Sequence, residues 1–148
     1  MSNILLIYPR TGIDIKPALA PPHSLLAIAA YPVKQGMNIK IIDQRVDKQW
    51  EDTLRIELAM KPELVGISTM TGIQIKYAMM IATKVRQLSK VPIIFGGAHP
   101  SLTATQVLES GLADAVCVGE GDYKLFNNLI KKNLKGIWEK EQYVNLDE

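Results

Sequence analysis

Two glycine-rich turns carry the residues of this chain best suited to contact a ligand. The first, GGAHPS at 96–101, follows the apolar run 91–95, and the second, GEGD at 119–122, follows the apolar run 115–118. Glycine lets a ligand approach the backbone, and the amino terminus of a following helix offers unpaired N–H groups. Turns of this kind lie at the carboxyl edge of a parallel sheet, so the two together predict a binding rim.

The residues that catalysis needs are scarce. The histidines, His23 and His99, stand outside any metal-ligand spacing, and neither the G-x-G-x-x-G motif nor the P-loop occurs. The single Cys117 lies in an apolar run. It excludes an internal disulfide and a multi-cysteine metal site, and we expect it to be buried and inert. A stand-alone enzyme would therefore lack a nucleophile paired with a base.

Three residues near the predicted rim have alternative roles. His99 either hydrogen-bonds the loop backbone or contacts a ligand. His23, at the start of a predicted helix, is expected to be structural. Ser68 ends an apolar run and precedes Thr69 and Thr71, either of which is a candidate helix N-cap. Ser68 itself is a candidate hydrogen-bond partner for a heteroaromatic group inserted between strand ends, and the two readings of this turn are compatible.

Composition argues against several classes of partner. The chain has 148 residues, with 17 Lys and Arg against 15 Asp and Glu, a net charge of +2 and no basic tract. Binding to nucleic acid or to a membrane surface has no electrostatic support. No signal peptide and no run of about 18 apolar residues occurs, so we expect a cytoplasmic protein.

Apolar runs alternate with amphipathic segments, which predicts an α/β fold with a parallel sheet. We expect strands at 3–8, 38–43, 64–68, 92–95 and 115–118, and helices at 24–35, 48–60, 73–89, 102–110 and 122–132. Right-handed crossovers then give a flavodoxin-like, Rossmann-like, three-layer αβα domain whose five strands have the order 2-1-3-4-5. Its core should include Leu5, Ile7, Val65, Ile67, Ile93, Phe95 and Val116.

The end of the chain breaks this pattern. Residues 1–133 form the predicted domain, whereas 134–148 contain only two candidate short strands, 136–138 and 143–144. We expect 134–148 to be a linker toward a further, C-terminal domain.

Five segments, in this order, resemble the cobalamin-binding domain that precedes the catalytic domain in cobalamin-dependent radical SAM enzymes. They are ILLIYPR at 4–10, PPHSLLAIAAY at 21–31, VGISTMTG at 65–72, IIFGGAHPS at 93–101 and VGEGD at 118–122. The resemblance covers nearly the whole chain. It implies that the nucleotide tail of cobalamin runs down the crevice between the first and third strands.

The resemblance also implies a set of cofactor-binding residues at the strand ends. Ser68, Thr69 and Met70 would flank the dimethylbenzimidazole of the tail, while Arg10 and Thr11 would lie near the lower face of the corrin. The remaining positions would border the tail or the corrin edge: Gly96, Gly97, His99, Pro100, Gly119, Glu120 and Gly121. Gly96 and Gly97 would allow close approach to the backbone.

Two motifs of related proteins are missing. The D-x-H-x-x-G motif, which supplies a histidine to cobalt in other cobalamin proteins, is replaced by PRTG at 9–12. Cobalamin is therefore expected to bind without a histidine ligand, and the resemblance, which places the nucleotide tail in the crevice, implies that it binds base-off. The C-x-x-x-C-x-x-C motif is also absent, and one cysteine cannot hold an iron–sulfur cluster. S-adenosylmethionine and the cluster are expected in a C-terminal radical SAM domain of the same parent polypeptide.

We interpret the chain as the cobalamin-binding module of a radical SAM methyltransferase or cyclase, presenting cobalt to a catalytic domain and not itself catalytic. One alternative is a cofactor-free flavodoxin-like domain for signalling or protein interaction. A receiver domain would need acidic residues after the first strand, where the chain has Tyr8, Pro9 and Arg10. A stand-alone enzyme is the third possibility. Fold alone does not choose among them.

Overall fold

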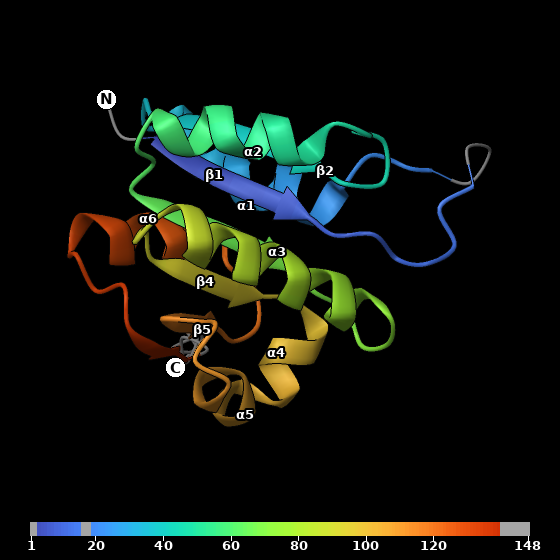
Figure 1. The fold of residues 1–148 in the computed structure, drawn as a ribbon. Helices are drawn as coiled ribbons and strands as arrows, with labels where there is room; N and C mark the ends of the chain where they lie inside the picture. The colour runs from blue at the N-terminus through green and yellow to red at the C-terminus, as the bar shows by residue number, and fades with distance from the viewer. Residues whose placement is uncertain (1–2, 16–18, 140–148) are drawn as a thin grey trace.

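A parallel sheet of six strands forms the centre of the computed structural model, which describes residues 3–15 and 19–139 (Figure 1). The strands are β1 (Asn3–Tyr8), β2 (Asn38–Asp43), β3 (Leu64–Ser68), β4 (Ile93–Gly96), β5 (Ala115–Cys117) and β6 (Gly136–Trp138). Their order is β2-β1-β3-β4-β5-β6. The predicted order 2-1-3-4-5 is confirmed, and β6 extends it at the β5 edge.

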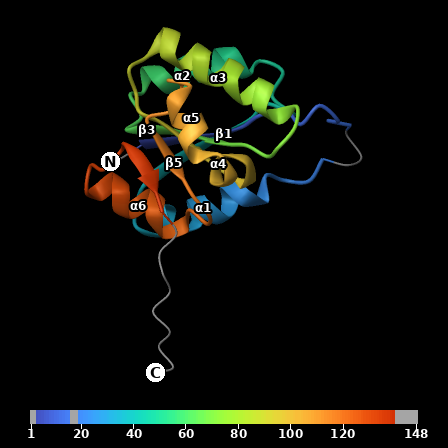
Figure 2. The same cartoon turned by 90° about the horizontal axis from the view of Figure 1, so that it is seen from below.

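Helices cover both faces of the sheet, which confirms the predicted three-layer architecture. They are α1 (His23–Lys34), α2 (Trp50–Ala59), α3 (Gln74–Leu88), α4 (Ala98–Leu102), α5 (Ala104–Glu109) and α6 (Asp122–Ile130). Figure 2 shows α2 and α3 on one side of the sheet, with α1 and α6 on the other. Within the described residues, no helix is both long enough and apolar enough to cross a membrane.

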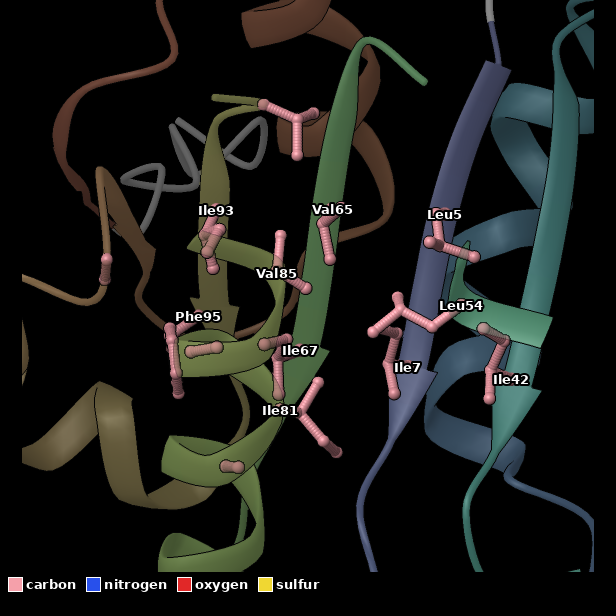
Figure 3. Close-up of a cluster of buried hydrophobic side chains, with 14 of the residues drawn as sticks. Leu5, Ile7, Ile42, Leu54, Val65, Ile67, Ile81, Val85, Ile93 and Phe95 are labelled. Carbon is pink, nitrogen blue, oxygen red and sulfur yellow. The ribbon is translucent and has the colours of Figure 1, made fainter. Parts of the chain in front are cut away.

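Successive residues of each strand face opposite layers, so the sheet divides the apolar core in two. On the α2/α3 face, Ile67 and Phe95 pack in one cluster with Leu54 of α2 (Figure 3). On the α1/α6 face, Leu6 and Ile94 belong to a second cluster. All seven residues predicted for the core lie in the first cluster: Leu5, Ile7, Val65, Ile67, Ile93, Phe95 and Val116.

The prediction of five strands was one too few. Residues 136–138 form β6, and the Val118 N–H donates to the Trp138 carbonyl at 2.9 Å beyond the β5–β6 ladder. Trp138 is only 4% exposed and belongs to the α1/α6-side core. Burial of this large side chain stabilises a strand of three residues. The other candidate strand, 143–144, lies outside the described residues.

The single helix predicted at 102–110 is also wrong, because the structure has two short helices there. The first, α4, starts at Ala98 and contains Pro100. Proline is tolerated in a first helical turn, where its missing N–H would have no partner anyway. Thr103 leaves the helical conformation with φ −130°, and its hydroxyl donates to the His99 carbonyl at 2.9 Å. That residue separates α4 from α5.

Truncating a side chain between α2 and the sheet should show how much this layer contributes to stability. Leu54 is fully buried, whereas Ile56 on the same helix is 65% exposed. We expect Leu54→Ala to lower the free energy of unfolding by about 2–5 kcal/mol through cavity formation. Ile56→Ala should change it by no more than about 0.5 kcal/mol. Urea unfolding measures both, and similar losses for the two variants would contradict the proposed packing.

Candidate functional site

An apolar pocket lies at the carboxyl ends of the central strands, on the face that α1 and α6 cover. We call it the strand-end pocket, and its lining residues are Leu6, Leu25, Ile28, Gly66, Ile67, Ser68, Ile94, Gly96, Cys117, Gly121, Leu125 and Trp138. Its volume is about 40 Å³. Of the predicted site residues, Ser68, Gly96 and Gly121 are brought together here.

Glycines keep this pocket from being filled by side chains. A Cβ at Gly96 would lie 3.8 Å from the Cβ of Cys117, an ordinary contact, so the backbone accepts a side chain there at the expense of pocket space. A Cβ at Gly121 would lie 3.4 Å from the Cys117 sulfur. A Cβ at Gly66 would lie 2.7 Å from the terminal Cδ2 methyl of Leu6, so that side chain would have to shift.

Gly97 is needed for a different reason. Its φ is +106°, and a Cβ would lie 2.6 Å from the carbonyl oxygen of Thr69. Hydrogen bonds hold the two segments together, since the Thr69 N–H donates to the Gly96 carbonyl at 2.9 Å and the His99 N–H donates to the Thr69 carbonyl at 3.2 Å. A side chain at Gly97 would therefore press on the backbone of the β3 exit and not on the strand-end pocket.

The strand pleat separates Ser68 from Thr69, although both were predicted to flank the same ligand group. Ser68 lines the strand-end pocket, whereas Thr69 lines a second pocket of about 140 Å³ on the opposite face, between α3 and α5. His99 also lines this α3–α5 pocket, with its Nε2 3.3 Å from the Thr103 hydroxyl. Thr69 is 1% exposed, and its hydroxyl has no hydrogen-bond partner among the described residues. The sheet thus lies between His99 and Ser68.

The two glycine turns are connected through one serine. The Ser101 hydroxyl donates to the Gly97 carbonyl at 2.7 Å and accepts from the Gly119 N–H at 2.9 Å. Gly119 and Glu120 border an open hollow next to α1, which shares Ile28 with the strand-end pocket. These two residues therefore lie beside the pocket and do not line it.

The remaining predicted residues lie apart from the strand-end pocket. Met70 is 47% exposed at the rim, and Pro100 is buried in α4. The Arg10 N–H donates to the side-chain carbonyl of Gln44 at 2.9 Å, toward the β2 side of the sheet. The Thr11 hydroxyl donates to the Asp14 carboxylate at 2.6 Å. Arg10 is therefore held by the residue that follows β2, and Thr11 by the turn that follows β1.

The side chain of Arg45, just after β2, holds the far end of this long loop by a hydrogen bond. Arg45 pairs with Asp43 at 2.7 Å, donates to the Ala20 carbonyl at 2.9 Å, and places its guanidinium 4.4 Å from the centre of the Tyr8 ring. The hydrogen bond with Asp43 raises the pKa of Arg45, so the guanidinium stays charged. The loop between β1 and α1 thus has an electrostatic anchor near α1.

Sequence reasoning missed Gln74 and most of the apolar lining. Gln74 is 2% exposed, donates through Nε2 to the Pro9 carbonyl at 2.9 Å, and accepts through Oε1 from the Met70 N–H at 2.7 Å. A polar residue in the first turn of a helix is usually solvated, so no sequence signal marks it. The lining residues Leu25 and Leu125 are detectable as apolar positions at helical spacing, but their convergence on the glycine turns depends on the tertiary fold.

Comparisons with known proteins identify a family and a shared fold. The family described as the B12 binding domain matches residues 17–126. The radical S-adenosylmethionine methyltransferase TsrM from Kitasatospora setae, solved with cobalamin and a 4Fe-4S cluster, is 22% identical with a TM-score of 0.71, over 89% of this chain and 25% of that one. The cobalamin-dependent S-adenosylmethionine radical enzyme OxsB, solved with aqua-cobalamin and S-adenosylmethionine, is 20% identical with a TM-score of 0.70, over 91% of this chain and 19% of that one.

These two similarities show that the fold is shared. This chain spans about a quarter or less of the length of either protein. The search of curated proteins found no match.

Removing the buried hydroxyl of Thr69 should stabilise the chain. Thr69→Val keeps the side-chain shape and eliminates a polar group that has no partner, so we expect the free energy of unfolding to rise by about 1–3 kcal/mol. In the control Thr53→Val, the lost hydroxyl donates to Asp47 at 2.7 Å, so the free energy should fall. Urea unfolding measures the free energy of unfolding of both variants. A loss of stability in Thr69→Val would show that the hydroxyl has a partner.

Proposed function

We propose that this chain, which belongs to the B12-binding domain family, binds cobalamin with the nucleotide tail in the strand-end pocket. The observation that carries the proposal is an apolar pocket at the sheet's carboxyl edge, with Ser68 and Gly96 in its wall. Parallel α/β sheets bind ligands at this edge, next to the point where the strand order reverses.

The lining suits a heteroaromatic base. Apolar walls contact its ring faces, Gly96 leaves room beside the backbone, and the Ser68 hydroxyl can donate to a ring nitrogen. The volume of about 40 Å³ is small beside the engineered cavity of about 150 Å³ that admits benzene. Entry of dimethylbenzimidazole therefore requires lining side chains of α1 and α6, such as Leu25 and Leu125, to move outward.

Neither the β1 exit nor the GGAHPS turn offers a histidine on the strand-end pocket's side of the sheet. The β1 exit reads Pro9, Arg10, Thr11, and His99 lies on the other face of the sheet. A tail in the strand-end pocket is also away from the metal. We therefore propose that cobalamin is held base-off and without a histidine ligand.

The proposed module serves a larger enzyme. Bound cobalamin supplies a cobalt centre that carries a methyl group or accepts electrons. The chain's own residues bind the tail, orient it and exclude water. We propose that the module extends beyond the expected boundary at 133, because β6 belongs to its sheet and Trp138 to its core. The rest of the predicted linker 134–148 would lead toward a C-terminal radical SAM domain with S-adenosylmethionine and an iron–sulfur cluster, and the parent would be a methyltransferase or cyclase. The shared fold and the partial coverage of TsrM and OxsB support this proposal.

Titration of cobalamin followed by absorbance tests binding. We expect the wild type to bind and Gly96→Val to bind more weakly by about 1–3 kcal/mol, because the added methyl groups occupy the pocket. Ala98→Val is the control, since Ala98 is exposed in the same turn and does not line the pocket. Gly97→Val is unsuitable as a probe, because its side chain would collide with the Thr69 backbone.

Two outcomes of this titration would contradict the proposal. A wild type that binds no cobalamin would favour the cofactor-free signalling or interaction domain. Equal affinity of wild type and Gly96→Val would show that the tail lies elsewhere.

Electron paramagnetic resonance of the Co(II) form tests the base-off state. We expect no superhyperfine splitting from an axial nitrogen, because the benzimidazole has left cobalt and no histidine replaces it. His99→Ala should leave the spectrum unchanged. Nitrogen splitting in the wild type would show that a histidine or the retained benzimidazole ligates cobalt, contrary to the proposed binding mode.

A further inference from the structure

Strands β1 and β3 pair side by side and then separate at the carboxyl edge of the sheet. Their ladder ends at the Ile7–Ile67 pair. The chain then continues from β1 toward α1 on one face and from β3 toward α3 on the other (Figure 2). The Pro9 carbonyl and the Met70 N–H therefore lie beyond the ladder, where no strand partner satisfies them.

The side chain of Gln74 bridges this gap. Its amide nitrogen donates to the Pro9 carbonyl at 2.9 Å and its oxygen accepts from the Met70 N–H at 2.7 Å. The carboxamide thus replaces the missing ladder and ties the two diverging chains to the first residue of α3. Because Gln74 is 2% exposed, breaking either bond would leave a buried polar group unsatisfied.

The neighbouring contacts seal the same side of the crevice. Gly12 packs so closely on Ile73 that a Cβ would lie 2.5 Å from its Cγ2. The loop after β1 therefore closes over the start of α3. On the other face, the strand-end pocket remains between the sheet and α1 and α6. The gap between the β1 and β3 exits is thus occupied on its α3 side by Gln74 and the loop after β1, and the α3–α5 pocket lies further along the sheet, beside Thr69 and Phe95.

We propose that Gln74 is a positioning residue of the cobalamin site, an inference that rests on the proposed function. It fixes the separation of the β1 and β3 exits and occupies the α3 side of the gap between them, so the nucleotide tail enters that gap from the α1/α6 side. Gln74 does not line the strand-end pocket. Gln74 acts through Met70, because it accepts a hydrogen bond from the Met70 N–H, and Met70 lies two positions after Ser68.

Binding of cobalamin and of cobinamide, a corrinoid without the nucleotide tail, tests this role. Gln74→Met keeps the length of the side chain and removes both hydrogen bonds. We expect it to weaken cobalamin binding by about tenfold or more, equivalent to about one lost hydrogen bond. Cobinamide affinity should stay within about twofold of the wild type, because that ligand does not use the crevice.

Gln44→Met is the matched control. Gln44 is also buried, and its side-chain oxygen accepts from the Arg10 N–H at 2.9 Å, but it lies on the β2 side of β1. Thermal melting without corrinoid compares the stability of the two variants. We expect Gln74→Met to lose more cobalamin affinity than Gln44→Met. If Gln74→Met fails to fold, Gln74→Glu replaces it, since that variant keeps the acceptor for Met70 and loses the donor to Pro9.

The outcomes separate this inference from the proposed function. Cobalamin binding by the wild type with unchanged affinity in the Gln74 variant would overturn the role of Gln74 alone. Equal losses for cobalamin and cobinamide, or equal losses in the Gln74 and Gln44 variants, would also overturn it by indicating general loosening of the rim. A wild type that binds no cobalamin would overturn both the role of Gln74 and the proposed function.

Discussion

The structure depends on one topological constraint, which is that β1 and β3 are neighbours whose chains leave the sheet toward opposite faces. Helices must cover both faces of a buried parallel sheet, and this requirement forces the two exits apart. The separation creates a crevice and deprives backbone groups of ladder partners. Gln74 satisfies two of those groups on the α3 side. The strand-end pocket on the α1/α6 side is the space that we propose for the ligand.

The pleat and the glycines then determine which residues reach that space. Because side chains alternate between faces, Ser68 lines the strand-end pocket and Thr69 lines the α3–α5 pocket. Gly96 leaves the pocket open, whereas Gly97 allows β4 to approach the β3 exit. Adjacent glycines in one turn thus have distinct physical roles. The face of the sheet to which each position along a strand points therefore matters to the site as much as the residue type does.

The sheet was largely predictable from sequence, because a strand buried on both faces is a continuous apolar run. Strands 3–8, 38–43 and 64–68 have the predicted bounds. The strand at 136–138 could not be established this way, since its stability depends on tertiary burial of Trp138. The rim was recognisable from its glycines. Gln74 was not, because its function arises from the distance between two chain segments that are remote in sequence.

The most direct test of the account is a crystal structure of this chain with cobalamin. We expect the dimethylbenzimidazole to lie between the sheet and helices α1 and α6, in contact with Ser68 and Gly96, with the side chains of Leu25 and Leu125 displaced outward. A benzimidazole still bound to cobalt, or one in the α3–α5 pocket beside Thr69 and His99, would contradict it.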